Sequence, residues 1–196
     1  SKESFIKFTK NAQKSCKFAG YYVQVQQGTG EAEHWKTLVE ALDEMEIPYG
    51  LYIYSAGCDE KVAESEYEAF KKYTKGVPLK YNKYPLMTDL EYGGDQTGIL
   101  NFYNEELGKN KYIVYSNASR MVEYGYHEMV NEFWVAHYGV ANVIPYKYYG
   151  EYDDASQELA DAKIWQYADT GFEKFFDTSH LDLNIVTDGW YDKYAR

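Results

Sequence analysis

The chain has 196 residues, of which 45% are hydrophobic and 26% charged, so it can bury the core of one domain and is not globally disordered. Its formal net charge of −11 argues against a nucleic-acid binder, which needs a basic face, and against electrostatic adhesion to anionic lipid. No apolar run approaches the about 20 residues of a membrane-spanning helix, and residues 1–10 lack the apolar stretch of a secretory signal. We expect one domain over residues 1–196, with neither nucleic acid as a partner nor insertion into a membrane.

Taken in chain order, seven short apolar and aromatic runs predict buried strands, at residues 21–25, 50–54, 84–90, 112–115, 133–137, 163–167 and 180–183. Helical spacing of apolar residues separates the early runs, over residues 31–46, over residues 59–75 and around residues 99–107. Beyond residue 137 this alternation decays, and residues 139–161 are predicted as a long loop with one short helix at 155–160.

The alternation of strands with helices predicts an α/β fold in which crossover helices join parallel strands. Seven strands in a chain of this length favour a (β/α) barrel of the TIM type over an open doubly wound sheet. Gly28, Thr29 and Gly30 match neither the dinucleotide nor the P-loop pattern, which removes the main support for the open alternative.

Nothing in the sequence predicts a metal or another cofactor. Cys16 and Cys58 lack the paired spacing of metal ligands, and either one disulfide or two thiols fits them. The chain has no His/Cys cluster suited to zinc and no Ser-His-Asp arrangement with supporting motifs. We therefore expect no cofactor.

Two carboxylates end the third predicted strand. Residues two apart in a strand point to the same side, so Asp89 and Glu91 face together while Leu90 points towards the helices. In parallel barrels the carboxyl ends of the strands carry the active site. Like-charge crowding there raises one pKa, as a general acid near neutral pH requires. A solvated acidic strand end is the alternative that the spacing alone leaves open.

The last predicted strand repeats this arrangement. Leu181 and Leu183 can face the helices, which leaves Asp182 and Asn184 on the barrel side. Asp182 would then add a carboxylate to the polar end of the barrel. A surface position beside a helix start is the alternative.

Aromatic residues make up 18% of the chain, including 23 Tyr and 4 Trp. A Tyr side chain offers a flat apolar face and a hydroxyl, which suits stacking on sugar rings with simultaneous hydrogen bonding. Core packing and AT-rich codon usage explain the same composition, so both interpretations stay open.

Five motifs in series resemble the family 25 glycoside hydrolases, which are lysozymes. Pro-Leu-Met-Thr-Asp-Leu-Glu at residues 85–91 is similar to the family's Pro-x-x-x-Asp-x-Glu strand. Residues 133–138, 164–167 and 180–184 resemble its Trp-(Ile/Val)-Ala-x-Tyr, (Leu/Ile)-Trp-Gln-Tyr and Val-Asp-x-Asn segments. Residues 47–54 resemble its Gly-x-Tyr-His-Phe region. The resemblance runs from about residue 21 to the end, in order and at plausible spacing.

The resemblance implies a lysozyme-type muramidase with an irregular barrel. Its substrate would be the glycan strands of peptidoglycan, cut at the β-1,4 bond between N-acetylmuramic acid and N-acetylglucosamine. Glu91 would protonate the leaving oxygen, Asp89 would orient the 2-acetamido group of the sugar, and Asp182 would complete the acidic cluster. A phage endolysin or bacterial cell-wall hydrolase, acting outside the cell or at the wall, fits this activity. The candidate sugar contacts are Tyr52, Tyr54, Tyr115, Trp134, Tyr138 and Trp165, and core packing is the alternative for each.

One family feature is not found: the first strand with Asp-x-Ser-x-x-Gln. Residues 1–10 contain no Asp, and Phe5, Ile6, Lys7 and Phe8 form the only candidate strand there. A barrel without its first strand has two unpaired sheet edges. Three origins are open: truncation or processing of a longer chain, a strand borrowed from another copy, or divergence into a glycan-binding module with weak or no catalysis.

Overall fold

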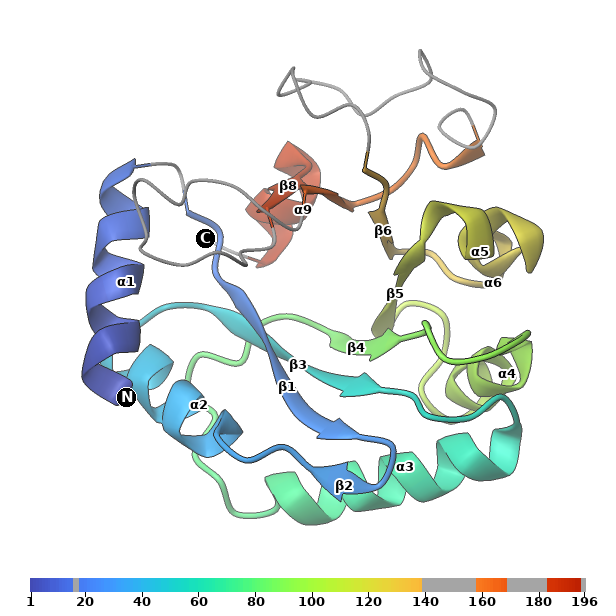
Figure 1. The fold of residues 1–196 in the computed structure, drawn as a ribbon, viewed down its shortest axis with the longest axis horizontal. Coiled ribbons are helices and arrows are strands. Elements are labelled where there is room, and N and C mark those ends of the chain that lie inside the picture. The colour runs from blue at the N-terminus through green and yellow to red at the C-terminus, as the bar shows by residue number, and fades with distance from the viewer. Residues whose placement is uncertain (16–17, 139–157, 169–182, 195–196) are drawn as a thin grey trace.

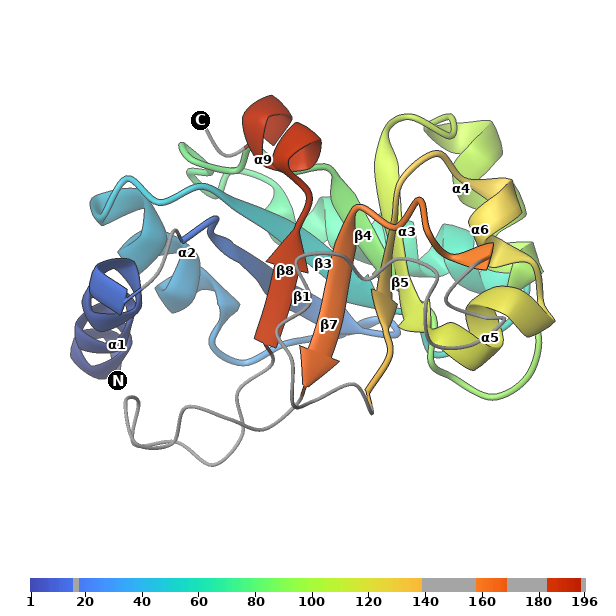
Figure 2. The same ribbon diagram turned by 90° about the horizontal axis from the view of Figure 1, so that it is seen from above.

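The computed structural model describes residues 1–15, 18–138, 158–168 and 183–194. Within them, eight strands form one curved sheet in the order β2-β1-β3-β4-β5-β6-β7-β8 (Figures 1 and 2). The pairs from β1 to β7 are parallel, whereas β2 and β8 run antiparallel to their neighbours. The strands are β1 (Tyr21–Gln27), β2 (Gly30–Glu31), β3 (Tyr49–Tyr54), β4 (Leu86–Asp89), β5 (Tyr112–Asn117), β6 (Phe133–Ala136), β7 (Ile164–Ala168) and β8 (Leu183–Val186).

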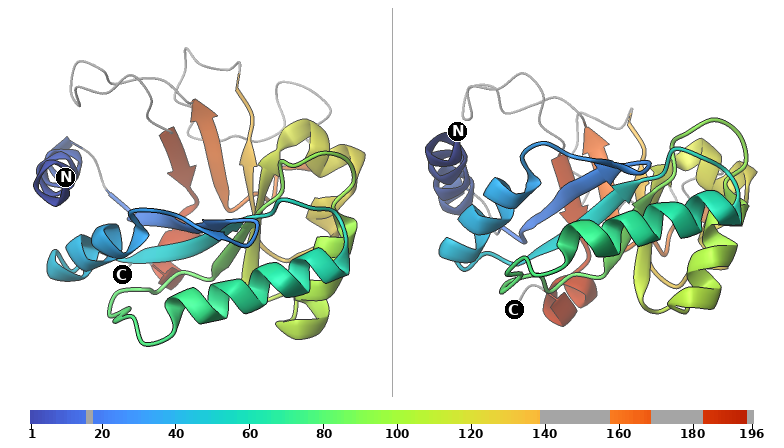
Figure 3. Two further views of the ribbon diagram at one scale, coloured as in Figure 1. Left: turned by 60° about the horizontal axis from the view of Figure 1, so that its bottom comes forward. Right: turned by 90° about the horizontal axis from the view of Figure 1, so that it is seen from below.

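Helices surround the outside of this sheet, and Figure 3 shows α3 lying lengthwise along β1 and β3. Two helices begin at residues whose side chains accept a hydrogen bond from the first turn: Asp59 from the Val62 amide and Asn117 from the Arg120 amide, each at 3.0 Å. None of the described helices has the length and apolar character to cross a membrane. The helices are α1 (Lys2–Ser15), α2 (Trp35–Glu44), α3 (Glu60–Thr74), α4 (Thr97–Glu106), α5 (Ala118–Glu123), α6 (Tyr126–Met129) and α9 (Asp188–Tyr194).

The outward-facing strand residues form the core between sheet and helices. Val23 and Val25 of β1 pack with Trp35 and Leu42 of α2, and all four are buried. A second cluster joins β3 to β7 with α3, α4 and α5, and it includes Leu90, which is fully buried. Each such aliphatic side chain contributes about 1.5–3 kcal/mol to folding.

Aromatic side chains fill the inward face. The ring of Tyr22 on β1 lies 5.5 Å from the ring of Trp134 on β6, and 5.6 Å from that of Tyr84. Tyr84 in turn lies 4.8 Å from Trp190 on α9. Because these contacts join strands from distant parts of the sheet, the interior of the curved sheet is a packed core.

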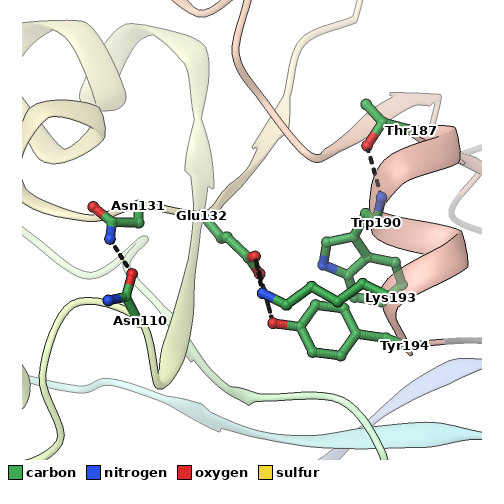
Figure 4. A network of polar contacts seen from close by, with 7 residues as sticks. All are labelled: Asn110, Asn131, Glu132, Thr187, Trp190, Lys193 and Tyr194. Carbon is green, nitrogen blue, oxygen red and sulfur yellow. Dashed lines mark hydrogen bonds and ion pairs between the residues drawn. The ribbon is translucent and has the colours of Figure 1, made fainter.

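Helix α9 is attached at the end of this interior where the parallel strands begin, and Figure 4 shows its polar contacts there. Glu132, which directly precedes β6, accepts a hydrogen bond from Lys193 Nζ at 2.7 Å and one from the Tyr194 hydroxyl at 3.2 Å. The opposite end, where β4 stops at Asp89, is left for a functional site.

Most expected elements are confirmed, but the last strand lies later than predicted and one candidate strand is part of a helix. Six expected strands and three expected helices lie where the sequence placed them, and the mixed α/β sheet has the barrel-like form that was expected. The seventh strand is β8 at Leu183–Val186, later than predicted, and residues 180–182 lie outside the described part. Residues 139–157, most of the predicted long loop, lie outside it as well.

The candidate strand at Phe5 to Phe8 was wrong, because these residues lie within helix α1. A short apolar run does not distinguish strand from helix, and here tertiary contacts select the helix. The Phe5 ring packs 5.2 Å from that of Tyr21, and the hydroxyls of Thr9 and Tyr21 are hydrogen-bonded at 2.9 Å. Within the described residues no ladder joins β8 to β1, so the barrel is open between them.

We predict that Glu132→Ala lowers the free energy of unfolding by about 1–2 kcal/mol, since it removes a half-exposed ion pair and a hydrogen bond that attach α9. Urea denaturation measures this loss. Glu105→Gln, on the exposed face of α4, serves as the control and should stay within about 0.5 kcal/mol of the wild type. Equal stability of the two variants would contradict this role of Glu132.

Candidate active site

Asp89 ends strand β4 between two tyrosines. In the parallel ladders, Asp89 is the register partner of Tyr54 on β3 and of Tyr115 on β5. Met87, two residues earlier, belongs to the inward cluster, whereas Leu90 belongs to the cluster beneath the helices. Strand alternation therefore turns Asp89 inward at the carboxyl end of the sheet, as the sequence predicted.

The Asp89 carboxyl group is buried, with 7% of the residue exposed. Its Oδ1 atom has no hydrogen-bond partner among the described residues. Burial, and secondly the charge of Glu91, raise the pKa of Asp89 to about 8. At neutral pH this side chain is therefore mostly the neutral acid.

Glu91 lies two residues further on, in the exposed segment that follows β4. It is close enough for its charge to raise the pKa of Asp89 and, after burial and Asp89, that of Tyr54. The spacing of Asp89 and Glu91 predicts that crowding raises one pKa of this pair. In the structure it is Asp89 whose pKa is raised, and burial is the larger cause.

An aromatic wall continues from Asp89 across the inward face. The Tyr115 hydroxyl donates to Gln166 Oε1 at 2.7 Å, and the Tyr115 ring meets that of Trp134 edge-on at 5.2 Å. Trp134 Nε1 donates to Asn184 Oδ1 at 3.0 Å. These hydrogen bonds fix the rings, so the wall offers flat apolar faces in set orientations.

Tyr52 and Tyr54 extend the wall along β3. Both are partly exposed, and the Tyr52 hydroxyl donates to Gln24 Oε1 at 3.4 Å. Sequence reasoning missed Gln24 and Gln166, although the period-two alternation of β1 and β7 could have placed them inside.

Three other predicted site residues are not brought into this group. Trp165 is buried in the cluster under the helices, where its Nε1 donates to the His137 carbonyl at 3.0 Å. Tyr138 follows β6 and is 46% exposed. Asp182 lies outside the described residues. The structure thus gathers Asp89, Glu91, Tyr54, Tyr115 and Trp134, with Tyr52 beside them.

The chemistry available here is that of two carboxyl groups in different surroundings. A buried neutral acid beside a solvated carboxylate is an arrangement for proton transfer. In the described part of the chain, no group of three His, Cys, Asp or Glu side chains is arranged to hold a metal ion.

Comparison with known proteins gives one family and one fold. The family model of the glycosyl hydrolases family 25 matches residues 3–174. No curated protein matches the sequence. Among solved structures, the glycosyl hydrolase 25 GHIP of Streptococcus pneumoniae superposes with a TM-score of 0.70 at 19% identity, over 94% of this chain and 86% of that one.

Two longer proteins share the fold. The CTP1L endolysin has a TM-score of 0.64 at 18% identity, over 94% of this chain. The modular autolysin LytC of Streptococcus pneumoniae, in complex with a synthetic peptidoglycan ligand, has a TM-score of 0.64 at 18% identity, over 93% of this chain. The chain spans 62% of the length of the first protein and 42% of the second.

We predict that Asp89 makes the free energy of unfolding decrease as the pH rises. Because its folded pKa of about 8 exceeds the unfolded value near 4, the folded state holds an extra proton between these values. Its contribution is fully present below about pH 4 and decreases by about 1.4 kcal/mol per pH unit until about pH 8. Asp89→Asn, which cannot ionise, should remove this slope.

Urea denaturation at pH 5, 6.5 and 8 measures the effect. The Asn variant should gain stability relative to the wild type as pH rises. Parallel pH dependences of the two proteins would show that Asp89 is not a buried neutral acid.

Proposed function

The chain belongs to glycosyl hydrolase family 25, and from this we propose that it is a lysozyme-type N-acetylmuramidase. Its reaction would be hydrolysis of the β-1,4 bond between N-acetylmuramic acid and N-acetylglucosamine in peptidoglycan. The observation that carries the proposal is the pair at the end of β4, where buried Asp89 holds a proton beside exposed Glu91. LytC, whose structure holds a synthetic peptidoglycan ligand, supports glycan as the substrate class.

Glu91 is the group that reaches the glycosidic oxygen, because it is exposed where Asp89 is not. A general acid must hold a proton when the bond breaks. In the free protein the pair keeps one proton up to about pH 8, on Asp89. A sugar that covers Glu91 removes water from its carboxylate, which favours passing this proton to Glu91.

Asp89 then becomes the carboxylate that orients the substrate. Its unpartnered Oδ1 has a free acceptor position, which the N–H of a 2-acetamido group can fill. The sugar thus supplies the partner that Asp89 Oδ1 lacks among the described residues. Asp182, as in the family motif, would complete the acidic cluster.

The aromatic wall is the proposed binding surface for the glycan. Tyr54 and Tyr115 lie on the two strands adjacent to that of Asp89, and Trp134 lies beside Tyr115 on the next strand, so sugar units beside the scissile bond would stack on this wall. Tyr52 and exposed Tyr138 are proposed contacts further along. The buried position of Trp165 makes it a structural residue instead. The protein would act at the cell wall, as an endolysin or autolysin does.

A glycan-binding module with weak or no catalysis is the second candidate. One observation favours it: residues 2–15 form helix α1 and contain no Asp, so in this described part of the chain the first-strand Asp of the family motif has no counterpart. A smaller acidic cluster gives less electrostatic stabilisation of the positive charge that develops on the sugar.

We predict that Glu91→Gln lowers the release of reducing sugars from purified peptidoglycan by at least about 1,000-fold, because the amide cannot donate an acidic proton. The variant should bind peptidoglycan as the wild type does. Glu105→Gln is the matched control and should keep full activity. Full turnover by Glu91→Gln would exclude the proposed role, and saturable binding without turnover by the wild type would establish the binding module.

We also predict an alkaline limit to activity near pH 8, where the Asp89–Glu91 pair loses its proton. The logarithm of kcat/KM, which reports the free protein, should fall with a slope of about −1 per pH unit above that value. In Asp89→Asn this limit should move to lower pH, since the pair then has one titrating carboxyl group. An unchanged pH profile in that variant would contradict proton sharing.

A further inference from the structure

Glu91 lies in an exposed loop between β4 and α4. Residues 91–95 between β4 and α4 are all exposed, and Gly93 adopts a left-handed backbone conformation with φ of 54°. Such segments are mobile unless other parts of the chain hold them. A general acid must nevertheless stay within hydrogen-bond reach of the atom that it protonates.

One side chain, Arg120 of α5, reaches across and binds this loop along its length. Its Nε donates to the Leu90 carbonyl at 3.2 Å, and its Nη1 donates to the Gly93 carbonyl at 2.5 Å. Its Nη2 contacts the carbonyls of Gly94 at 2.6 Å and Tyr92 at 3.2 Å. The guanidinium group thus holds carbonyls on both sides of Glu91.

Arg120 is itself held in place by neighbouring residues. Its backbone amide is bound by the side chain of Asn117, the residue that caps α5, and its guanidinium lies 5.3 Å from the ring centre of Tyr124. Nη2 also donates to Gln96 Oε1 at 3.0 Å, and the Gln96 amide group donates to the Gly57 carbonyl at 2.7 Å. The loop is therefore tied to α5 and to the segment after β3.

Only an arginine can make this set of contacts. Its planar group carries five donors in a fixed fork, whereas a lysine offers a single ammonium group. The chain uses arginine at positions 120 and 196 alone and lysine at its other basic positions. Arginine, which is rare in this chain, thus occupies the position that needs a planar group with several hydrogen-bond donors.

We propose that Arg120 is the positioning residue of the active site, which fixes the loop so that Glu91 meets the glycosidic oxygen. The inference rests on the proposed function of Glu91. Arg120 contacts carbonyls of the loop, so it acts on the reaction through Glu91 and not on the sugar. A displacement of about 1 Å in a reacting group costs on the order of 100-fold in rate.

The test compares Arg120→Ala and Arg120→Lys with the wild type on purified peptidoglycan. Arg120→Ala should lower kcat by about 100-fold, with KM within about threefold, because binding by the aromatic wall is kept. Arg120→Lys should recover at most about a tenth of the lost rate, since it keeps the charge without the fork. Added guanidinium ion at about 20 mM, which is far below denaturing concentrations, should partly restore the kcat of Arg120→Ala. It should not raise the kcat of the other proteins.

Lys193→Met is the matched control. It removes a hydrogen bond of similar length at the opposite end of the molecule, so it reports general destabilisation without touching the loop. It should show neither the kcat loss nor the guanidinium rescue. Wild-type kcat in Arg120→Ala, or equal kcat losses in Arg120→Ala and Lys193→Met, would overturn the proposal.

Backbone ¹⁵N relaxation of residues 91–96 provides a readout without turnover. Arg120→Ala should raise the mobility of these residues, and Lys193→Met should not. If the wild type has no turnover, the proposed function fails, and this measurement still decides whether Arg120 holds the loop. Unchanged relaxation in Arg120→Ala would overturn the inference by itself. Should Arg120→Ala not fold, Arg120→Lys carries both measurements.

Discussion

The burial of one carboxyl group, Asp89, is the constraint on which the site depends. An ionised carboxylate without a partner is costly away from water, so Asp89 stays protonated to about pH 8. The rest of the molecule keeps it there. The parallel strands β3 and β5 on either side fix the register of Asp89. The next residue, Leu90, packs in the core beneath the helices. The stored proton is what makes the pair with exposed Glu91 suited to acid catalysis.

One end of the barrel is filled by packed side chains, and the other end carries the candidate site. At the end where the strands begin, α9 and Glu132 close a core of aromatic rings that pack at tilted angles. At the other end, Tyr54 and Trp134 of the same inward face are partly exposed near Asp89. A single face of the sheet therefore supplies core packing below and the proposed sugar-binding wall above.

Sequence patterns predicted what depends on local periodicity. The inward turn of Asp89 and the outward turn of Leu90 follow from strand alternation, and the positions of the strands along the chain follow from the apolar runs. Periodicity did not place Phe5 to Phe8, because a short apolar run fits a helix equally well. It left both sugar contact and core packing open for Trp165, and the structure places this side chain in the core under the helices.

What the sequence could not show depends on contacts between distant residues. Arg120 binds carbonyls that precede it by 26 to 30 positions, and no local pattern marks such a contact. The raised pKa of Asp89 arises mainly from burial by several strands, whereas spacing alone suggested repulsion by Glu91. The most direct test is ¹³C NMR titration of the Asp89 carboxyl group, with and without a non-hydrolysable thioglycoside fragment of peptidoglycan. The account predicts a pKa near 8 in the free protein and a marked decrease when the fragment binds; a pKa near 4 in both states would contradict it.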